Sequence, residues 1–128
     1  MTLNEQDNKL LVRFSFNDNR LCISMHVLYA LSSPNWIQVL ISADRKTMFI
    51  KGCDETTRDR FSVPARVYTD SSYKYRLRKA AFKEAVCNAQ NWDENGKYRL
   101  FGHVIADGVI GFIFADAVRL DGVSALDD

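Results

Sequence analysis

Basic residues occupy every second position of the segment YKYRLRK, residues 73–79. Side chains of an extended chain point alternately to opposite faces, so Lys74, Arg76 and Arg78 would share one face and the tyrosines would lie on the other. These cations would be about 6.6–6.8 Å apart along a strand, which is near the spacing of adjacent phosphates on one strand of nucleic acid. The pattern therefore permits contact with a phosphate backbone.

Positive charge is concentrated in this part of the chain. The 128 residues carry a net charge of +1, whereas residues 58–83 contain eight Lys or Arg and only two Asp, a local charge of +6. Two arginines of an earlier hairpin, Arg13 and Arg20, are positioned to share an outer face. The sequence predicts DNA binding through one set of residues: Arg13, Arg20, Lys74, Arg76, Arg78 and Lys79.

A second interpretation of the basic strand involves no nucleic acid. Lys and Arg on exposed or edge strands deter edge-to-edge pairing, and they can pair with acids across a sheet. The chain would then be a protein-interaction or accessory domain, and an accessory domain of a mobile element is one form of this alternative. The tyrosines, expected opposite the cations, argue against a base-stacking platform. Both interpretations remain open at this stage.

Catalytic chemistry has little support in the sequence. The two histidines, His26 and His103, have no spaced partner that resembles a metal-binding set. Cys22 and Cys87 fall within regular elements, where buried and inert thiols are common. Acidic pairs lie in turns and tails, where carboxylates are usually solvated. We predict a non-catalytic protein without metal, cofactor or small-molecule substrate.

The first half of the chain predicts two hairpins with a helix between them. Residues 9–16 alternate apolar and polar side chains, the polar turn 17–19 follows, and 20–24 return as a second strand. An apolar stripe predicts a short helix over 25–32, which Pro34 ends. Residues 36–42 and 47–52 form the second predicted hairpin.

The second half resembles the first. A polar connector over 53–64 leads to predicted strands at 65–69 and 73–78, an Ala-rich helix over 79–91, and a hairpin of 97–105 with 108–115. The acidic tail, 121–128, is predicted to be frayed.

Short identities recur between the two halves. Asn35-Trp36 corresponds to Asn91-Trp92, each between a helix and a strand. We predict an α+β fold that is a tandem duplication of a ββαββ-like unit, with pseudo-repeats over about 9–52 and 65–120. Antiparallel sheets and two helices would share one core in a single domain, 1–128. Both tryptophans are predicted to pack in that core. The alternative is an unrepeated α+β domain with coincidental dipeptides.

Composition bounds the setting of the protein. Three widely spaced cysteines predict reduced thiols in the cytoplasm. No apolar stretch approaches 18 residues, so no transmembrane helix is predicted and no membrane partner is expected.

The hairpin, short helix and second hairpin over residues 12–51 resemble the swapped-hairpin DNA-binding domain of the AbrB family, and the repeat over 66–115 resembles its tandem MraZ branch. The hallmark of that family is a Gly-Arg that opens the second strand and a proline that starts the helix. Arg20 matches the arginine, and Arg76 occupies the equivalent place, but the glycine and the proline are absent. The resemblance implies a transcription regulator that is a homodimer or pseudo-dimer and contacts DNA through these arginines.

Overall fold

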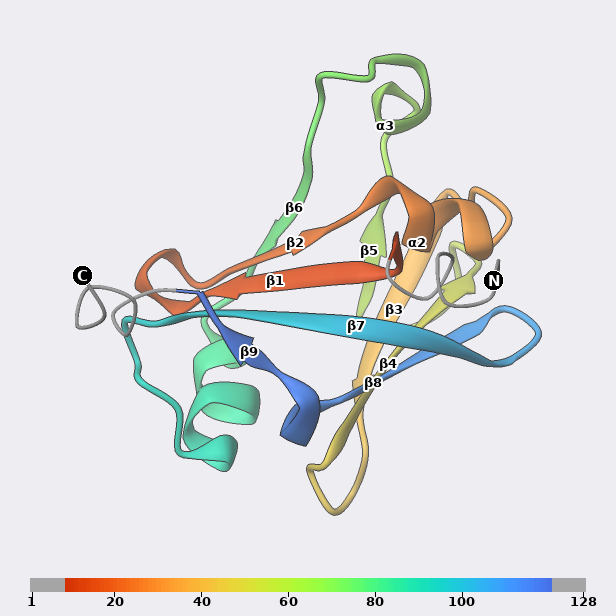
Figure 1. Ribbon diagram of the computed structural model, residues 1–128. Coiled ribbons are helices and arrows are strands. Elements are labelled where there is room, and N and C mark those ends of the chain that lie inside the picture. Colours follow the sequence, from red (N-terminus) through yellow and green to blue (C-terminus); the bar gives the residue numbers. More distant parts are fainter. Residues whose placement is uncertain (1–8, 121–128) are drawn as a thin grey trace, which may run out of the picture.

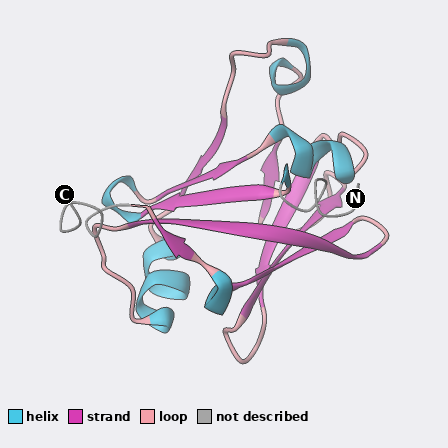
Figure 2. Ribbon diagram, in the orientation of Figure 1, coloured by secondary structure: helices cyan, strands magenta, loops and turns pink. Residues whose placement is uncertain are grey.

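The computed structural model describes residues 9–120 and consists mainly of strands (Figure 1). The strands are β1 (Leu11–Ser15), β2 (Arg20–Ile23), β3 (Trp36–Ile41), β4 (Thr47–Cys53), β5 (Arg60–Ser62), β6 (Tyr75–Arg78), β7 (Lys97–Ala106), β8 (Val109–Ile113) and β9 (Val118–Arg119). The helices are α2 (Met25–Ala30), α3 (Arg66–Thr69) and a helix over 81–90 whose central part, Lys83–Asn88, is π-helical. Two 3-10 turns, Phe16–Asp18 and Phe114–Asp116, complete the elements. The architecture is mixed α+β with few helices, which lie outside the strands (Figure 2).

All strand pairs are antiparallel, and they follow the order β5-β3-β4-β8-β7-β1-β2-β6, with β9 added beside β7. The two ends of this path approach each other, because the hydroxyl of Tyr75 on β6 donates a hydrogen bond to the carbonyl oxygen of Ser62 on β5 at 2.7 Å. The sheet is therefore a nearly closed barrel.

The long strand β7 belongs to both sides of the barrel. Its first half pairs with β1 and its second half pairs with β8. Gly102 lies at the junction, where an added Cβ atom would be only 2.5 Å from a ring carbon of Phe112. The absence of a side chain lets β7 pass close to β8 as it changes partners.

Three of the predicted hairpins are confirmed by the strand pairing. β1 pairs with β2, β3 with β4, and β7 with β8. The predicted turn 17–19 is present after β1, and its last residue, Asn19, has a left-handed backbone with a φ of 51°. The helices predicted around 25–32 and 79–91 are also present, as is the strand at 75–78.

One prediction for the middle of the chain is wrong. Residues 65–69, predicted as a strand, contain helix α3, which follows Pro64 and buries Val67. Pro64 lies just before the helix, where its missing N–H is not needed, and its carbonyl oxygen accepts a hydrogen bond from the N–H of Val67 at 2.9 Å. The predicted connector contains a strand, β5, which pairs with β3. The predicted frayed tail lies outside the described residues.

The core is one cluster of buried side chains from most of the strands. Phe14, Phe16, Phe112 and Phe114 are among its largest members. Trp92 packs against this cluster, as predicted, and stacks on Tyr98 with ring centroids 4.2 Å apart. The prediction for Trp36 is wrong: it is half-buried outside the cluster, with Arg60 at 4.6 Å from its ring. Within residues 9–120, no helix is both long and apolar enough to cross a membrane.

Candidate nucleic-acid interface

The outer surface of strands β7, β1, β2 and β6 carries most of the predicted basic residues. Strand register places Arg99 opposite Arg13, Arg13 opposite Cys22, and Cys22 opposite Arg76, so these four side chains form one row across the sheet. A parallel row contains Lys97, Ser15, Arg20 and Arg78. We define the cationic face as Arg13, Arg20, Lys74, Arg76, Arg78, Lys97 and Arg99.

The structure joins the two predicted groups of cations into this one surface. Arg13 and Arg20 come from the first hairpin, and Lys74, Arg76 and Arg78 come from β6 or the residue before it. They meet because β2 pairs directly with β6. Lys79 is not brought together with them, since its ammonium lies 5.5 Å from the ring of Phe61, near β5.

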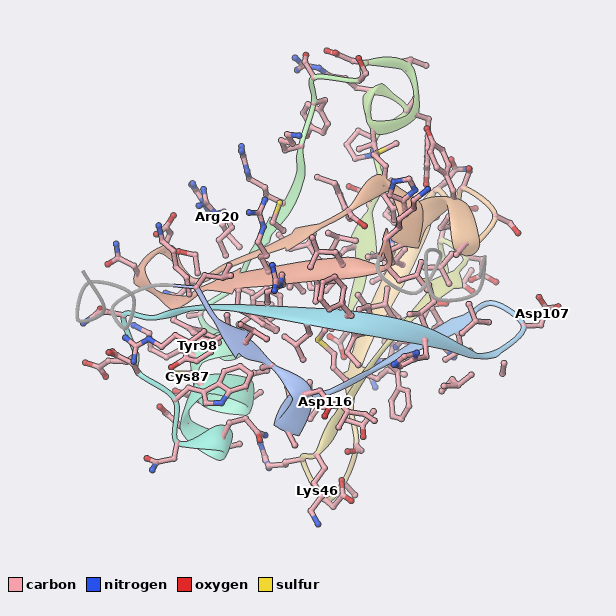
Figure 3. The ribbon with its side chains drawn as sticks, in the orientation of Figure 1. Arg20, Lys46, Cys87, Tyr98, Asp107 and Asp116 are labelled. Carbon is pink, nitrogen blue, oxygen red and sulfur yellow. The ribbon has the colours of Figure 1, made fainter. Side chains whose placement is uncertain are left out.

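Most of these cations are open to solvent. Arg13, Lys74, Arg76 and Arg78 are exposed, and within residues 9–120 no carboxylate lies within ion-pair distance of them. Arg20 differs, because its guanidinium forms an ion pair with Asp18 at 3.3 Å. Figure 3 shows Arg20 extending away from the barrel on the side of β2 and β6. Four positive charges of the face thus have no acidic neighbour in the part of the chain described.

Like charges lie directly opposite each other on neighbouring strands. Arg13 faces Arg99 across β1 and β7, and Arg20 faces Arg78 across β2 and β6. Like charges that lie directly opposite each other on neighbouring strands destabilise a sheet. Folding therefore tolerates repulsion here that a different choice of side chains would avoid.

Two members of the face, Lys97 and Arg99, were missed in the sequence. Both alternate with the buried residues Tyr98 and Leu100, so the period-two pattern of β7 contains the signal. The guanidinium of Arg99 lies 5.0 Å from the ring centroid of Phe101, and its Nε is buried without a hydrogen-bond partner. These residues were overlooked because β7 is far from β6 in the sequence, while β1 and β2 separate them in space.

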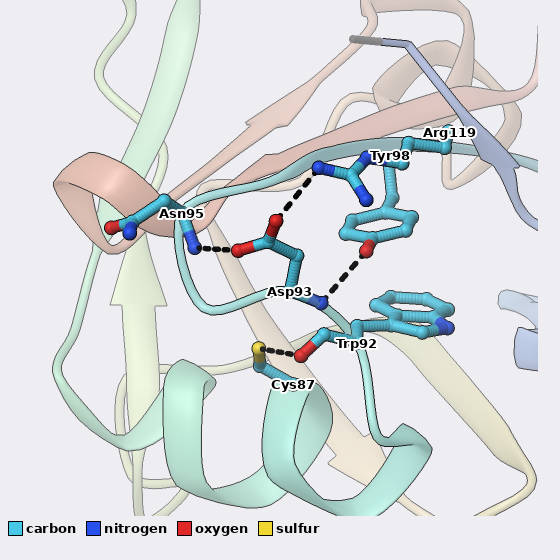
Figure 4. A network of polar contacts seen from close by, with 6 residues as sticks. All are labelled: Cys87, Trp92, Asp93, Asn95, Tyr98 and Arg119. Atoms are coloured by element: carbon cyan, nitrogen blue, oxygen red, sulfur yellow. Dashed lines mark hydrogen bonds and ion pairs between the residues drawn. The ribbon is translucent and has the colours of Figure 1, made fainter. Parts of the chain in front are cut away.

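A polar network fixes the loop that leads into β7 (Figure 4). The carboxylate of Asp93 accepts hydrogen bonds from Arg119 on β9 and from the backbone N–H of Asn95, at 2.8 and 2.9 Å. The backbone N–H of Asp93 donates to the hydroxyl of Tyr98 at 2.9 Å. The network holds the start of β7, and with it Lys97 and Arg99, against the rest of the sheet.

The two tyrosines before the basic residues differ in position. Tyr75 is buried, as the alternation predicts. Tyr73 precedes β6, is only half-buried, and lies with its ring 4.7 Å from the guanidinium of Arg66. The prediction that both tyrosines lie opposite the cations is confirmed for Tyr75 by its burial, whereas Tyr73 is partly exposed beside Lys74; both tyrosines contribute to the lining of one surface hollow. Alternation applies only within a strand, and β6 begins at Tyr75.

Two adjoining hollows indent the cationic face. The arginine hollow, about 180 Å³, is lined by four cations: Arg13, Arg20, Arg76 and Lys97. The tyrosine hollow, about 230 Å³, is lined by Tyr73 and Lys74 together with Ser24, Met25 and His26. Arg13 and Cys22 line both. The surface therefore combines a strongly basic depression with a mixed aromatic and polar one.

The residues considered for catalysis do not converge. His26 lines the tyrosine hollow, whereas His103 is on the second half of β7. Burial raises the pKa of the Cys87 thiol, which donates a hydrogen bond to the carbonyl oxygen of Trp92 at 3.3 Å. In residues 9–120, no three His, Cys, Asp or Glu residues gather in a group that could hold a metal ion.

Comparison with known proteins gives no relative: no family model matches the chain, and neither a curated protein nor a solved structure matches it.

The opposite part of the barrel has a different outer surface. On strands β3, β4, β8 and the second half of β7, register aligns Leu40 with Phe49 and Phe49 with Gly111. We define the apolar face as Leu40, Phe49, Ile105, Val109 and Ile113. Ile105 is 54% exposed and Ile113 is 44% exposed, so large apolar side chains meet solvent here.

Proposed function

We propose that the protein is a small, non-catalytic DNA-binding regulator that contacts the phosphate backbone of duplex DNA through its cationic face. The observation that carries the proposal is the set of directly opposed arginines, Arg13 with Arg99 and Arg20 with Arg78. A surface needed only for solubility would mix charges of both signs. Repulsion of this kind is relieved when a polyanion binds.

The location of the cations also supports DNA binding over edge protection. Edge protection requires basic residues on the strands that end a sheet. Arg13 and Arg99 lie instead on β1 and β7, which have pairing partners on both sides. Of the cationic face, only Arg76 and Arg78 are on a terminal strand of the path, β6.

The predicted duplication, and with it the resemblance to the tandem swapped-hairpin regulators, remains part of this proposal. If the halves are repeats, β2 is equivalent to β6 and β4 to β8. Each of these pairs is antiparallel and directly hydrogen-bonded, as expected for repeats related by a two-fold axis. Arg20 and Arg76, the residues that the resemblance assigns to DNA contact, then lie on neighbouring strands. The short helix α3, which replaces a predicted strand, weighs against this relation.

Electrophoretic mobility shift with a random-sequence duplex at low salt tests the proposal. The wild type is expected to bind, and the double variant Arg76→Glu/Arg78→Glu is expected to lose binding, because both contacts become repulsive. Both side chains are exposed, so thermal unfolding should occur at or above the wild-type temperature. Failure of the wild type to retard DNA at low salt would remove the proposed function.

A second candidate function is favoured by the apolar face. Its exposed side chains are of the kind that mark protein–protein contacts, and the sequence alternative of an interaction domain, or of self-association, would use them. Light scattering across a concentration series tests this candidate with Ile113→Lys as the variant. Association that the variant removes supports it, and a concentration-independent monomer mass in both proteins contradicts self-association.

A further inference from the structure

The arginine hollow has the composition of a phosphate subsite. Arg13, Arg20, Arg76 and Lys97 come from four neighbouring strands and border one depression of about 180 Å³. Guanidinium groups form paired, charge-assisted hydrogen bonds with phosphate oxygens. Asp18 forms an ion pair with Arg20 at 3.3 Å and so offsets the charge of that one arginine. Arg13 and Arg76 have no carboxylate within ion-pair distance among residues 9–120, so their charge is available to an anion.

The tyrosine hollow provides a surface on which a base can stack. Tyr73 is half-buried, and Arg66 holds its ring from the α3 side at 4.7 Å. Met25 adds an apolar contact, and Ser24 and His26 add polar groups. Stacking of a base on an aromatic side chain is worth about 1–3 kcal/mol and tolerates any base.

The two hollows are adjacent along the strand direction. Both are bordered by Arg13 and Cys22. Lys74 lines the tyrosine hollow and precedes Arg76, which lines the arginine hollow, by two positions, about 6.6–6.8 Å for an extended chain. This length is near the spacing of adjacent phosphates on one strand, so a nucleic-acid strand that runs along β6 would place a phosphate in one hollow and a neighbouring base in the other.

We propose that the paired hollows form a subsite for an unpaired nucleotide, with its phosphate in the arginine hollow and its base against Tyr73. The inference rests on the proposed nucleic-acid function and specifies the form of nucleic acid. A base within a duplex is stacked between its neighbours and cannot lie against a protein ring unless it leaves the stack. Single-stranded or frayed DNA is therefore the preferred ligand at this position, while intact duplex uses only the cationic contacts.

Fluorescence anisotropy tests the subsite with three labelled 12-nucleotide probes at one salt concentration: a single strand, its blunt duplex, and a single strand with abasic sites throughout. The wild type is expected to bind the single strand about tenfold more tightly than the duplex or the abasic strand, which is the size of one stacking contact. Tyr73→Leu should remove that advantage without changing duplex affinity. Tyr73→Phe, which keeps the ring, should retain it.

The outcomes separate this inference from the proposed function. If the wild type binds all three probes with equal affinity, and Tyr73→Leu does the same, the subsite is overturned and the cationic face is not. Absence of binding to every probe overturns both. If Tyr73→Leu fails to fold, the abasic probe with the wild-type protein decides the question alone. Inorganic pyrophosphate, added as a competitor, should displace both the abasic strand and the base-containing single strand from the arginine hollow. If one of these strands is not displaced, the assignment of this hollow to a phosphate is wrong.

Discussion

The cationic face and the apolar face belong to one barrel and rest on strands of the same construction. In β1 and in β4, inward positions are filled by buried apolar residues such as Val12 and Ile50. The outward positions differ: Arg13 occupies one in β1, and Phe49 occupies one in β4. The barrel thus accepts either a charged or an apolar side chain on its outer surface.

This difference separates the requirements of folding from those of binding. Inward residues contribute the burial that stabilises the fold, at roughly 25 cal/mol per Å² of apolar surface. Outward cations contribute no comparable burial, and like-charged residues are opposite each other in the register at Arg13–Arg99 and Arg20–Arg78. Folding does not need this cationic surface, and the opposite surface of the same barrel lacks it, which supports the proposed negatively charged ligand.

The largest effect expected of a single substitution comes from reversing a charge in an interior strand. Arg13→Glu should lower duplex affinity at least about tenfold at low salt, because one phosphate contact is lost and a repulsive charge is gained. The matched control is Lys46→Glu, at the far tip of the β3–β4 hairpin (Figure 3), which should leave affinity unchanged. Fluorescence anisotropy with a labelled duplex measures both. Equal weakening by the two variants would mean that net charge, not the cationic face, governs binding.

Alkaline pH should weaken the link between the barrel and the segment that carries β6. The hydroxyl of Tyr68 donates to the carbonyl oxygen of Pro34 at 2.6 Å, and burial raises the pKa of Tyr68 to about 12. Burial also raises the pKa of Tyr75. Because both pKa values exceed the unfolded value of about 10, their stabilisation is complete below pH 10 and is lost as pH rises toward 12.

Urea unfolding between pH 9 and 12 measures this loss. The variant Tyr68→Phe/Tyr75→Phe lacks both ionisable groups and should show a flatter pH dependence over that range. An identical decline in the variant and the wild type would assign the alkaline effect to other groups.

Thiol reactivity should differ between the two sides of the barrel. Cys22 lies between Arg13 and Arg76 on neighbouring strands, whereas Cys53 ends β4 and precedes Asp54. The dianionic reagent 5,5′-dithiobis(2-nitrobenzoate) should react several-fold faster with Cys22 at low salt, since the cationic face attracts it, and the ratio should fall as salt screens the charges. Cys87, buried and with a raised pKa, should react only on unfolding.

Single-cysteine variants isolate each rate, and neutral iodoacetamide serves as the control reagent. A rate ratio that is the same for both reagents, or that does not depend on salt, would contradict an electrostatic difference between the faces.

The smallest expected effect is on stability. Arg78→Glu replaces a like-charged pair with an opposite-charged pair beside Arg20, so the free energy of unfolding should rise by about 0.2–1 kcal/mol. Arg78→Gln should give an intermediate value. Urea unfolding measures both variants, and a less stable Arg78→Glu would show that the opposed arginines do not strain the sheet.

Local sequence patterns predicted most of the elements, because hairpins and helices depend on contacts between near neighbours. The alternation of residues 9–16 and the turn residue Asn19 define the first hairpin without help from the rest of the chain. Strand β5 could not be found in this way, since three residues with one apolar side chain form a strand only because β3 offers a free edge. Helix α3 depends on Pro64 and on the burial of Val67, which periodicity alone does not reveal.

The sequence predicted most residues of the site, but not the full surface that they form together. Alternation placed Lys74, Arg76 and Arg78 on one face, and the same reasoning placed Arg13 and Arg20 on another. Their union requires the pairing of β2 with β6, which joins segments more than 50 positions apart in the sequence. The contribution of Arg99 and the accessible position of Tyr73 likewise depend on where strands begin and which strands they meet.

The salt dependence of duplex binding tests the central claim most directly. Binding constants measured from low to physiological salt should fall along a log–log line with a slope of about −0.9 for each phosphate contacted. Four exposed cations without acidic neighbours among the described residues, Arg13, Lys74, Arg76 and Arg78, predict a slope near −3.6 or steeper. A slope near zero, or no binding at the lowest salt, would contradict the claim that this face exists to bind phosphates.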